Sequence, residues 1–501
     1  MVDKAGYYKR AVLPVVFLLS FCYLAFLSLS TQKNVYFSGD GGVKSIVVKQ
    51  IGHGESFKYL RLDQPKWVTD IWSAGYFPLR KPFVYPSSEG YIFSFPPLFQ
   101  IVNSFFYRAW GYIGLYVLPF FCALLLWTVF VLLLMRCGVP AYMAGLGLAV
   151  LVFASPLTIY GAIYWEHMPA VLLLFGGVWI LLDARVRIPA AILAGLACGM
   201  AVWLRPEGLV MDLLYGLAAL ALYRVRRSAA YLVFIGSVAA PVIGFLVFNK
   251  IEYGALLGVH SYQVLQEHSI FFKIAKAGYE FFLITWTNLQ YFPLVLLLVP
   301  AVYRIIRGKS RPELSLSLLL FAAAAFCLIS PLLMPNGGGR QWGARYLLPA
   351  VPVVVAGGVL LWKERGNGRL PGWALGLLAV GLAYSFIINT IVGGYSLRSS
   401  NLTRVKPAFD FAVAQPQEVV VVNSENIPME LASLFEKRYF FLVSGDTSLN
   451  RLMPMLKAQG IKDCLYIDEQ PLPHPAMINR LNRDSSLLKE GNYYFARYDL
   501  P

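Results

Sequence analysis

Long apolar runs separated by short polar breaks dominate this 501-residue chain and decide what it can fold into. After a first run near the N-terminus, further runs lie near residues 114–135, 140–158, 168–184, 188–204, 207–223, 230–249, 281–303, 314–333, 346–362 and 371–392. A helix that crosses a bilayer needs about 20 mainly apolar residues. Charged residues make up only 14% of the chain, against about 25% in soluble domains. We therefore predict a polytopic α-helical membrane protein with about eleven transmembrane helices.

The first apolar run, residues 11–30, admits two interpretations. Lys4, Lys9 and Arg10 precede it, and Ser28-Leu29-Ser30 resembles the small-residue cleavage site of a signal peptide. The run has about 20 residues, which is longer than the core of about 7–15 residues in a signal peptide and long enough to span a membrane. We favour a retained first transmembrane helix.

Basic residues concentrate in every second break and give the expected orientation. They are Arg136; Arg185 and Arg187; Arg224, Arg226 and Arg227; Arg304, Arg307, Lys309 and Arg311; and Lys363, Arg365 and Arg369. These breaks lie on the same side of the membrane as the N-terminus. Because cytoplasmic loops are enriched in Lys and Arg, we expect a cytoplasmic N-terminus and a C-terminus on the outer face.

The net charge of +16 lies almost wholly in the membrane portion, because the chain from residue 394 onward carries 12 basic and 12 acidic residues. Positive charge beside membrane helices favours phosphate-bearing lipids as partners. A nucleic-acid-binding protein would need its basic patch on a soluble face. The charge distribution therefore argues against nucleic acid.

The long loop of residues 31–112 opens with the stretch Phe37-Ser38-Gly39-Asp40-Gly41-Gly42-Val43-Lys44. The glycines around Asp40 allow backbone or ligand to approach closely. A helix that begins just after Asp40 would also point its N–H groups at a bound anion. We interpret Asp40 as the reactive acid of a membrane enzyme; the alternative is a helix-terminal carboxylate solvated among lipid headgroups.

The rest of this loop contains two further patterns. Val43, Ile46, Val47 and Ile51 recur at helical spacing, which predicts an amphipathic helix along the membrane surface. Aromatic residues then follow densely: Trp67, Trp72, Tyr76, Phe77, Tyr85, Tyr91, Phe93 and Phe95. They suit an interfacial aromatic belt or a surface on which sugars stack, and the sequence leaves both open.

Two other outer breaks hold acidic residues. Glu166 and His167 lie between two runs, where they suit hydrogen bonding to acceptor hydroxyls or support of Asp40, or are ordinary loop residues. Arg205 and Glu207 lie between the next pair of outer ends and are expected either to pair with each other or to serve a ligand. Asp212, a turn further in, is a candidate buried carboxylate.

Arg340 and Arg345 form the sharpest cationic cluster on the outer side. Positive charge in an outer loop runs against the usual bias. The planar guanidinium group suits bidentate binding of phosphate better than an ammonium group does. We therefore expect a ligand role for at least one of these arginines.

From residue 394 to 501 the chain reads as a small soluble domain outside the membrane. Strands are expected at 418–422, 439–443, 463–467 and 493–498, and helices at 428–438 and 449–459. Alternating strands and helices are typical of an α/β domain. No Gly-rich phosphate loop follows any of these strands, so we assign catalysis to residues 1–393.

Three features together resemble the GT-C superfamily of integral-membrane glycosyltransferases, which includes protein O-mannosyltransferases and the lipid A aminoarabinose transferase. They are Asp40 in the first external loop, the Tyr-Pro and Phe-Pro-Pro-Leu-Phe stretch of residues 85–99, and Trp-Gly-Ala-Arg-Tyr-Leu-Leu-Pro-Ala-Val-Pro at 342–352. The resemblance covers roughly residues 10–395. Several members carry two adjacent acids in the first loop, whereas Gly41 follows Asp40 here. A second acid would have to come from Glu55, Glu89 or Glu166.

The resemblance implies an inverting transferase of hexosyl or pentosyl type. It would move a sugar from a polyprenyl-phosphate donor to a lipid, glycan or protein acceptor on the outer face of a bacterial inner membrane. Asp40 would be the catalytic base, and a divalent metal is left open. The remaining roles expected are donor phosphate binding by Arg340, Arg345, Arg205 and Lys44, and acceptor binding or support by Glu166, His167 and Glu207.

Two other classes of function remain open. A flippase or transporter of lipid-linked sugars or polysaccharides would need polar residues near the bilayer midplane on several helices, and most runs lack them. No internal repeat is evident, although many transporters are built from repeated halves. A membrane-anchored assembly protein that binds through its soluble tail is the other alternative.

Overall fold

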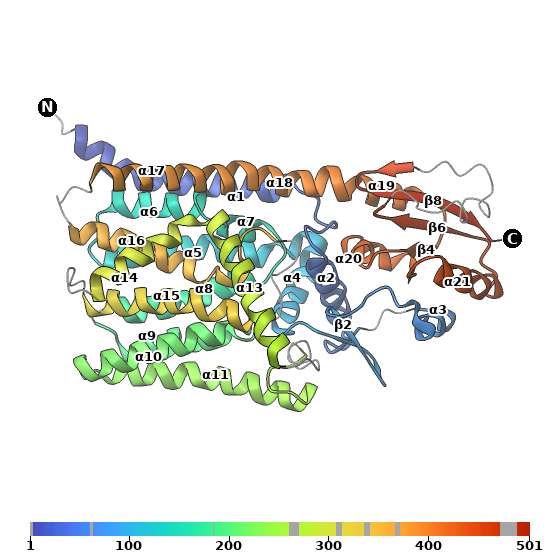
Figure 1. Ribbon diagram of the computed structural model, residues 1–501, viewed down its shortest axis with the longest axis horizontal. Helices are drawn as coiled ribbons and strands as arrows, with labels where there is room; N and C mark the ends of the chain where they lie inside the picture. The colour runs from blue at the N-terminus through green and yellow to red at the C-terminus, as the bar shows by residue number, and fades with distance from the viewer. Residues whose placement is uncertain are drawn as a thin grey trace. The chain divides into compact units, whose positions relative to one another are not determined.

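The structure is a computed structural model that describes residues 4–60, 64–183, 185–259, 270–306, 313–334, 341–365, 371–470 and 488–500. The chain divides into two compact units, each formed by two separate segments. The first unit contains residues Met1–Ser28 and Tyr116–Tyr395, and the second contains Leu29–Leu115 and Ser396–Pro501. Figure 1 shows the helices and strands of both.

The first unit is helical. Its elements are α1 (Lys4–Leu29), α5 (Val117–Arg136), α6 (Ala141–Phe153), α7 (Leu157–Ala162), α8 (His167–Leu182), α9 (Ile188–Ala201), α10 (Gly208–Arg226), α11 (Ala229–Tyr253), α13 (Ile270–Tyr291), η2 (Pro293–Leu297), α14 (Leu298–Ile306), α15 (Leu314–Leu333), η3 (Arg345–Leu347), α16 (Ala350–Arg365), α17 (Gly372–Phe386), η4 (Ile387–Val392) and the start of α18 (Gly393–Ser399).

Small residues allow these helices to pack closely. Helices α9 and α11 lie side by side (Figure 1). A Cβ atom on Gly195 would lie 2.6 Å from the carbonyl oxygen of Phe234, and one on Gly199 would lie 2.5 Å from that of Val238. Glycine at both positions lets the two backbones approach, as in many membrane helix pairs.

Six described helices are long and apolar enough to cross a membrane, or seven if a bent pair counts as one span. The bent pair is Ile274–Tyr291 and Pro293–Tyr303, with 101° between its parts. The span predicted near 281–303 is therefore bent in the structure, because Pro293 lacks the N–H that would continue the ladder of α13. Three further apolar helices, Ala141–Phe153, His167–Leu182 and Ile188–Ala201, are shorter. The protein is a multi-pass membrane protein.

The second unit joins the first loop to the C-terminal part of the chain. Its elements are α2 (Gly39–Gly52), β1 (Tyr59–Leu60), α3 (Lys66–Ile71), η1 (Trp72–Tyr76), β2 (Val84–Ser87), β3 (Gly90–Phe93), α4 (Leu98–Gly114), η5 (Ser400–Val405), α19 (Lys406–Ala414), β4 (Val419–Val422), α20 (Asn426–Glu430), η6 (Ala432–Glu436), β5 (Tyr439–Leu442), α21 (Asp446–Ala458), β6 (Asp463–Asp468), β7 (Leu488–Glu490) and β8 (Tyr493–Asp499). By contacts, the first loop thus groups with the C-terminal residues.

The C-terminal sheet has the strand order β5-β4-β6-β8-β7. Strands β5, β4 and β6 are parallel, and β8 and β7 add antiparallel strands at one edge. The predicted strands are all present. The continuous helix predicted at 428–438 is wrong: Leu431 leaves helical backbone (φ −98°, ψ 22°), so the short helix α20 is followed by the 3-10 helix η6.

Helix α2 is not the amphipathic surface helix that its sequence suggested. Residues 40–48 and Gln50 are all buried. The helix packs against α4 on one side and against α20 and η6 on another. Both its apolar and its polar side chains are therefore enclosed within the second unit, because elements from both segments of the unit cover the helix.

Most of the first-loop aromatic residues predicted to form a belt or a sugar surface are buried within the second unit, and Trp67, Tyr91 and Phe95 are half-buried. Trp72 is 4% exposed and donates its indole N–H to the carbonyl of Phe440 at 2.8 Å. Trp67 packs against Tyr439 and Phe441 of the sheet, with ring centroids 5.1 and 6.0 Å apart. These contacts fasten the loop to strand β5.

Candidate active site

The first unit gathers charged residues at the starts of two helices. Glu166 directly precedes α8, and Glu207 directly precedes α10. A carboxylate at a helix N-terminus is stabilised by the positive end of the helix dipole. The tight turn that ends at Gly208, closed by its N–H to the carbonyl of Arg205 at 2.9 Å, places Arg205 beside both acids.

Arg205 bridges these two carboxylates. Its Nη1 atom lies 3.0 Å from Oε1 of Glu166, and its Nη2 atom lies 2.5 Å from Oε1 of Glu207. Burial alone would lower the pKa of Arg205, but Glu207 and then Glu166 outweigh it and raise the pKa above the usual arginine value. The guanidinium is therefore permanently charged, and the interaction predicted between Arg205 and Glu207 is confirmed.

Arg345 completes this group, which we call the arginine–carboxylate cluster (Glu166, Arg205, Glu207 and Arg345). The Arg345 guanidinium carbon lies 5.4 Å from the ring centroid of Trp165 and 5.2 Å from that of Tyr346. Arg205 also faces the Tyr346 ring, at 5.6 Å. Aromatic faces attract cations, so Tyr346 holds two arginines close to one another.

Aromatic residues also set the backbone before Arg345. Tyr160 donates its hydroxyl hydrogen to the carbonyl of Trp342 at 2.9 Å. Gly343 has a positive φ of 73°, a conformation that L side chains rarely adopt. The His167 ring packs against two aromatic residues, with its centroid 5.1 Å from that of Tyr160 and 5.0 Å from that of Trp165. The residues predicted at three separate breaks are thus brought together.

Asp40 and Lys44 lie in the second unit, one turn apart on helix α2. Asp40 is 9% exposed and occupies the first turn of the helix. Lys44 is fully buried, with its Nζ atom 4.2 Å from the ring centroid of Phe95. Residues four apart share one helix face. Arg340, the remaining predicted phosphate ligand, lies outside the described residues.

Asp212 is a buried acid, as predicted, within α10. It is 4% exposed, and neither carboxylate oxygen has a hydrogen-bond partner in the described part of the chain. In the residues that the structure describes, no group of three His, Cys, Asp or Glu side chains could hold a metal ion. The acids of the arginine–carboxylate cluster face Arg205 instead, so these residues do not fit a metal site.

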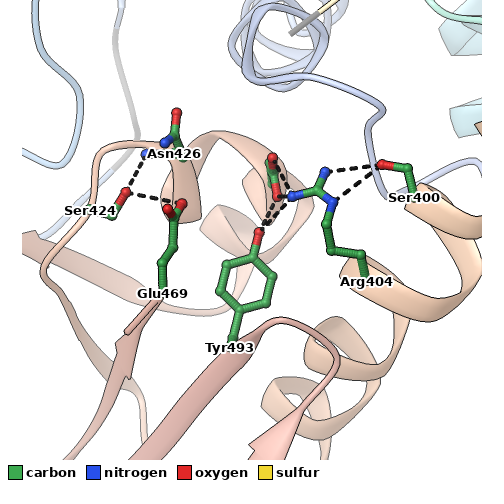
Figure 2. Close-up of polar contacts among 7 residues, drawn as sticks. Ser400, Arg404, Ser424, Asn426, Glu469 and Tyr493 are labelled. Atoms are coloured by element: carbon green, nitrogen blue, oxygen red, sulfur yellow. Dashed lines mark hydrogen bonds and ion pairs between the residues drawn. The ribbon is translucent and has the colours of Figure 1, made fainter. Parts of the chain in front are cut away.

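A second polar network, which was not predicted from the sequence, lies in the second unit. Figure 2 shows Arg404 close to Ser400 and Tyr493. Arg404 also pairs with Glu430, with Nη1 at 2.9 Å from Oε1 and 2.8 Å from Oε2. Asn401 lies one turn earlier in η5 and binds backbone near residue 35. No local sequence pattern distinguishes Arg404 as a member of this network.

The overall fold is similar to that of solved structures that cover nearly the whole chain. Among solved structures the chain is similar to ArnT, the lipid A aminoarabinose transferase, from Cupriavidus metallidurans. The apo structure of ArnT gives a TM-score of 0.51 and its structure bound to undecaprenyl phosphate gives 0.52, each with 13% identity over 99% of this chain and 98% of ArnT.

A third similar structure is the oligosaccharyltransferase of Archaeoglobus fulgidus, with a TM-score of 0.47 and 14% identity over 92% of this chain and 70% of that chain. No protein-family model matches the chain, and no curated protein matches it by sequence. The similarity is therefore one of fold.

Proposed function

We propose that the protein is an inverting glycosyltransferase that moves a hexosyl or pentosyl group from a polyprenyl-phosphate donor to an acceptor. The observation that carries this proposal is the full-length similarity in fold to ArnT, one of whose structures contains undecaprenyl phosphate. The arginine–carboxylate cluster supports it, because it holds two guanidinium groups beside buried acids and aromatic rings. The acceptor is a lipid, glycan or protein of the cell envelope.

The leaving group determines what the positive residues do. As the bond between the anomeric carbon and the phosphate oxygen breaks, its electron pair moves onto the phosphate, and the sugar gains oxocarbenium character. A phosphate is a weak base, so its departure needs no general acid. It needs positive charge that is already in place. We assign this role to Arg345, with Arg205, Arg340 and Lys44 as further donor phosphate ligands.

The acceptor determines what the acids do. Its hydroxyl oxygen forms the new bond to the anomeric carbon and must lose its proton as it attacks. A carboxylate that accepts this proton contributes about 10²–10⁴-fold to the rate. We assign the role of proton-accepting base to Asp40, and we assign support of the acceptor to Glu166, His167 and Glu207. Attack opposite the phosphate inverts the configuration of the sugar carbon.

The proposal includes a membrane topology. We propose about eleven spans, in which the bent pair counts as one span and the shorter helices α6, α8, α9 and α16 also cross the bilayer. With a cytoplasmic N-terminus, as the basic breaks indicate, the starts of α8 and α10 and residues 394–501 lie on the outer face. In a bacterial inner membrane this face is the periplasmic one.

Mass spectrometry of envelope glycans and lipids from cells with and without the protein tests the proposal. We expect one sugar to disappear from one acceptor when the protein is absent, while its polyprenyl-phosphate donor accumulates. Unchanged envelope glycans in the absence of the protein would contradict a transferase. An altered distribution of the lipid-linked sugar between the two leaflets would then favour a flippase.

A further inference from the structure

We infer that the η5 segment of the second unit is a clamp that positions Asp40, with Asn401 and Arg404 as its positioning residues. This inference deepens the proposed function and rests on it, because Asp40 is taken as the base. The η5 clamp consists of Asn401, Arg404 and Glu430. Two separate sets of contacts, which we call the first and second routes, connect it to residues 32–42, the stretch that contains Asp40.

The first route is direct and runs through Asn401. The Asn401 side chain is 4% exposed. Its Oδ1 atom accepts the backbone N–H of Gln32 at 2.8 Å, and its Nδ2 atom donates to the carbonyls of Gln32 at 3.0 Å and Val35 at 3.3 Å. One side chain therefore fixes the backbone that leads into α2.

The second route begins at Arg404. Its Nη1 atom binds both oxygens of Glu430, a side chain that is 1% exposed. Its Nε and Nη2 atoms donate to Oγ of Ser400, at 3.3 and 3.2 Å (Figure 2). The hydroxyl of Tyr493 also donates to Glu430. Since a buried carboxylate is costly unless paired, these bonds hold the end of α20 in one place.

The residue before Glu430 supports helix α2. A Cβ atom on Gly42 would lie 1.6 Å from the carbonyl oxygen of Met429, and one on Gly39 would lie 2.8 Å from its Cε atom. Glycine is required at position 42 because the helix approaches this carbonyl so closely. Nearby, Ser433 donates its hydroxyl hydrogen to the carbonyl of Asn34 at 2.7 Å. Two of the three glycines around Asp40, Gly39 and Gly42, are thus explained by contact with the segment that Glu430 anchors.

Both routes constrain the same short stretch, residues 32–42, from different directions. A general base must lie within hydrogen-bond reach of the proton it takes. A displacement of about 1 Å can cost about 10²-fold in rate. Loosening either route should therefore lower turnover. Donor binding should change much less, because three of the four assigned phosphate ligands, Arg345, Arg205 and Arg340, lie outside α2.

The test uses the full-length protein in lipid nanodiscs and three variants. Asn401→Asp keeps the size of the side chain but removes both donated hydrogen bonds. Arg404→Lys keeps the charge but cannot bind Glu430 and Ser400 together. Arg438→Lys is the matched control, because Arg438 binds backbone carbonyls of the same unit, with Nη2 at 2.5 Å from that of Gln415 and 3.4 Å from that of Val413.

Two readouts are taken from each variant: hydrogen–deuterium exchange of residues 36–48, and release of undecaprenyl phosphate from undecaprenyl-phosphate-linked sugars in a bacterial membrane extract that also contains the envelope acceptors. For Asn401→Asp and Arg404→Lys we expect at least about tenfold faster exchange in this peptide. We expect kcat to fall about tenfold or more, with KM for the donor within about twofold. Exchange in α8 and all values for Arg438→Lys should match the native protein.

The two claims fail in different ways. Unchanged exchange of residues 36–48 in both variants, in a protein that transfers sugar, would overturn the clamp. Faster exchange of this peptide in the two variants, with no release of undecaprenyl phosphate by the native protein, would leave the clamp intact and overturn the proposed function. If Arg404→Lys fails to fold, Glu430→Gln replaces it, because the amide keeps the size and one acceptor of the carboxylate.

Discussion

At the scale of single residues, several buried charges of the described chain have partners that compensate for lost hydration. Arg205 is the clearest case, since its guanidinium lies between Glu166 and Glu207. Removing one member of such a group lowers the free energy of unfolding by far more than the intact group raises it, because the remaining charges stay buried. This asymmetry gives the first prediction.

Replacing Arg205 by Met should lower the free energy of unfolding by about 3–5 kcal/mol. Glu166 and Glu207 would then lack the guanidinium that both bind. Thermal unfolding in detergent measures the loss. The triple variant Arg205→Met, Glu166→Gln and Glu207→Gln should recover most of it, because it removes the stranded charge. An unchanged unfolding temperature for Arg205→Met alone would contradict this account.

Lys33 gives a prediction that depends on pH. Burial lowers its pKa from 10.5 to about 8. Between these values the unfolded chain binds a proton that the folded chain does not, so stability rises with pH across this window. Lys33→Met should therefore stabilise the protein at pH 7, by an amount on the order of 2–3 kcal/mol. That advantage should vanish by about pH 10.5.

Unfolding midpoints at pH 7, 9 and 10.5 check this expectation. Lys66→Met serves as the control for loss of one positive charge, because Lys66 is exposed. A Lys33→Met advantage that stays constant over this range would show that hydrophobic burial, rather than the cost of charging Lys33, explains the gain.

At the scale of elements, helix α2 shows how one helix depends on residue size. It contains four glycines, yet they differ in what surrounds them. A Cβ atom on Gly42 would clash with the carbonyl of Met429, whereas one on Gly52 would have its nearest neighbour at 3.7 Å, in Arg108. The two glycines therefore make a matched pair within one helix.

We expect Gly42→Ala to displace α2 or prevent folding of the second unit, with sugar transfer reduced by about 10²-fold or more. Gly52→Ala should be neutral or slightly stabilising, because alanine favours helix and meets no obstacle. Expression, unfolding temperature and transfer activity of the two variants compare them directly. Equal behaviour of both would show that the contact with Met429 does not constrain the helix.

At the scale of the whole molecule, contacts rather than sequence order define the second unit. Trp72 of the first segment and Phe440 of the second lie 368 residues apart in the chain, yet share a hydrogen bond. A unit built in this way should open cooperatively, as one foldon. Neither segment alone covers the core that the aromatic residues form.

Trp72→Ala should therefore accelerate hydrogen exchange in strand β5 as much as in the loop helix α3. Removing a buried tryptophan costs about 3–5 kcal/mol, and the cost should appear throughout the second unit. Helix α9 of the first unit supplies the internal reference. Faster exchange confined to α3 would mean that loop and sheet open independently.

The sequence predicted those features that local patterns encode. The helix expected at 314–333 is present with the same bounds, since a long apolar run between polar breaks specifies a buried membrane helix. Pairing of Arg205 with Glu207 was predicted because two charges near hydrocarbon seldom stay apart. The bend at Pro293 was missed, although proline is its local signal.

The remaining features depend on contacts between distant parts of the chain. Helix α2 looked amphipathic because its sequence mixes valine, isoleucine and lysine, and only tertiary partners decide that both faces are buried. Arg404 and Glu430 are 26 residues apart, in elements whose packing no periodicity reveals. Their network, and hence the clamp on Asp40, could be found only once the second unit was assembled.

The most direct test of the central claim is the turnover of Asp40→Asn protein in lipid nanodiscs. Release of undecaprenyl phosphate from lipid-linked sugar would be measured in a bacterial membrane extract that also contains the envelope acceptors, beside binding of undecaprenyl phosphate itself. We predict unchanged binding and a rate that falls by about 10²–10⁴-fold, since the amide cannot accept the acceptor's proton. A rate equal to that of the native protein would show that Asp40 is not the base.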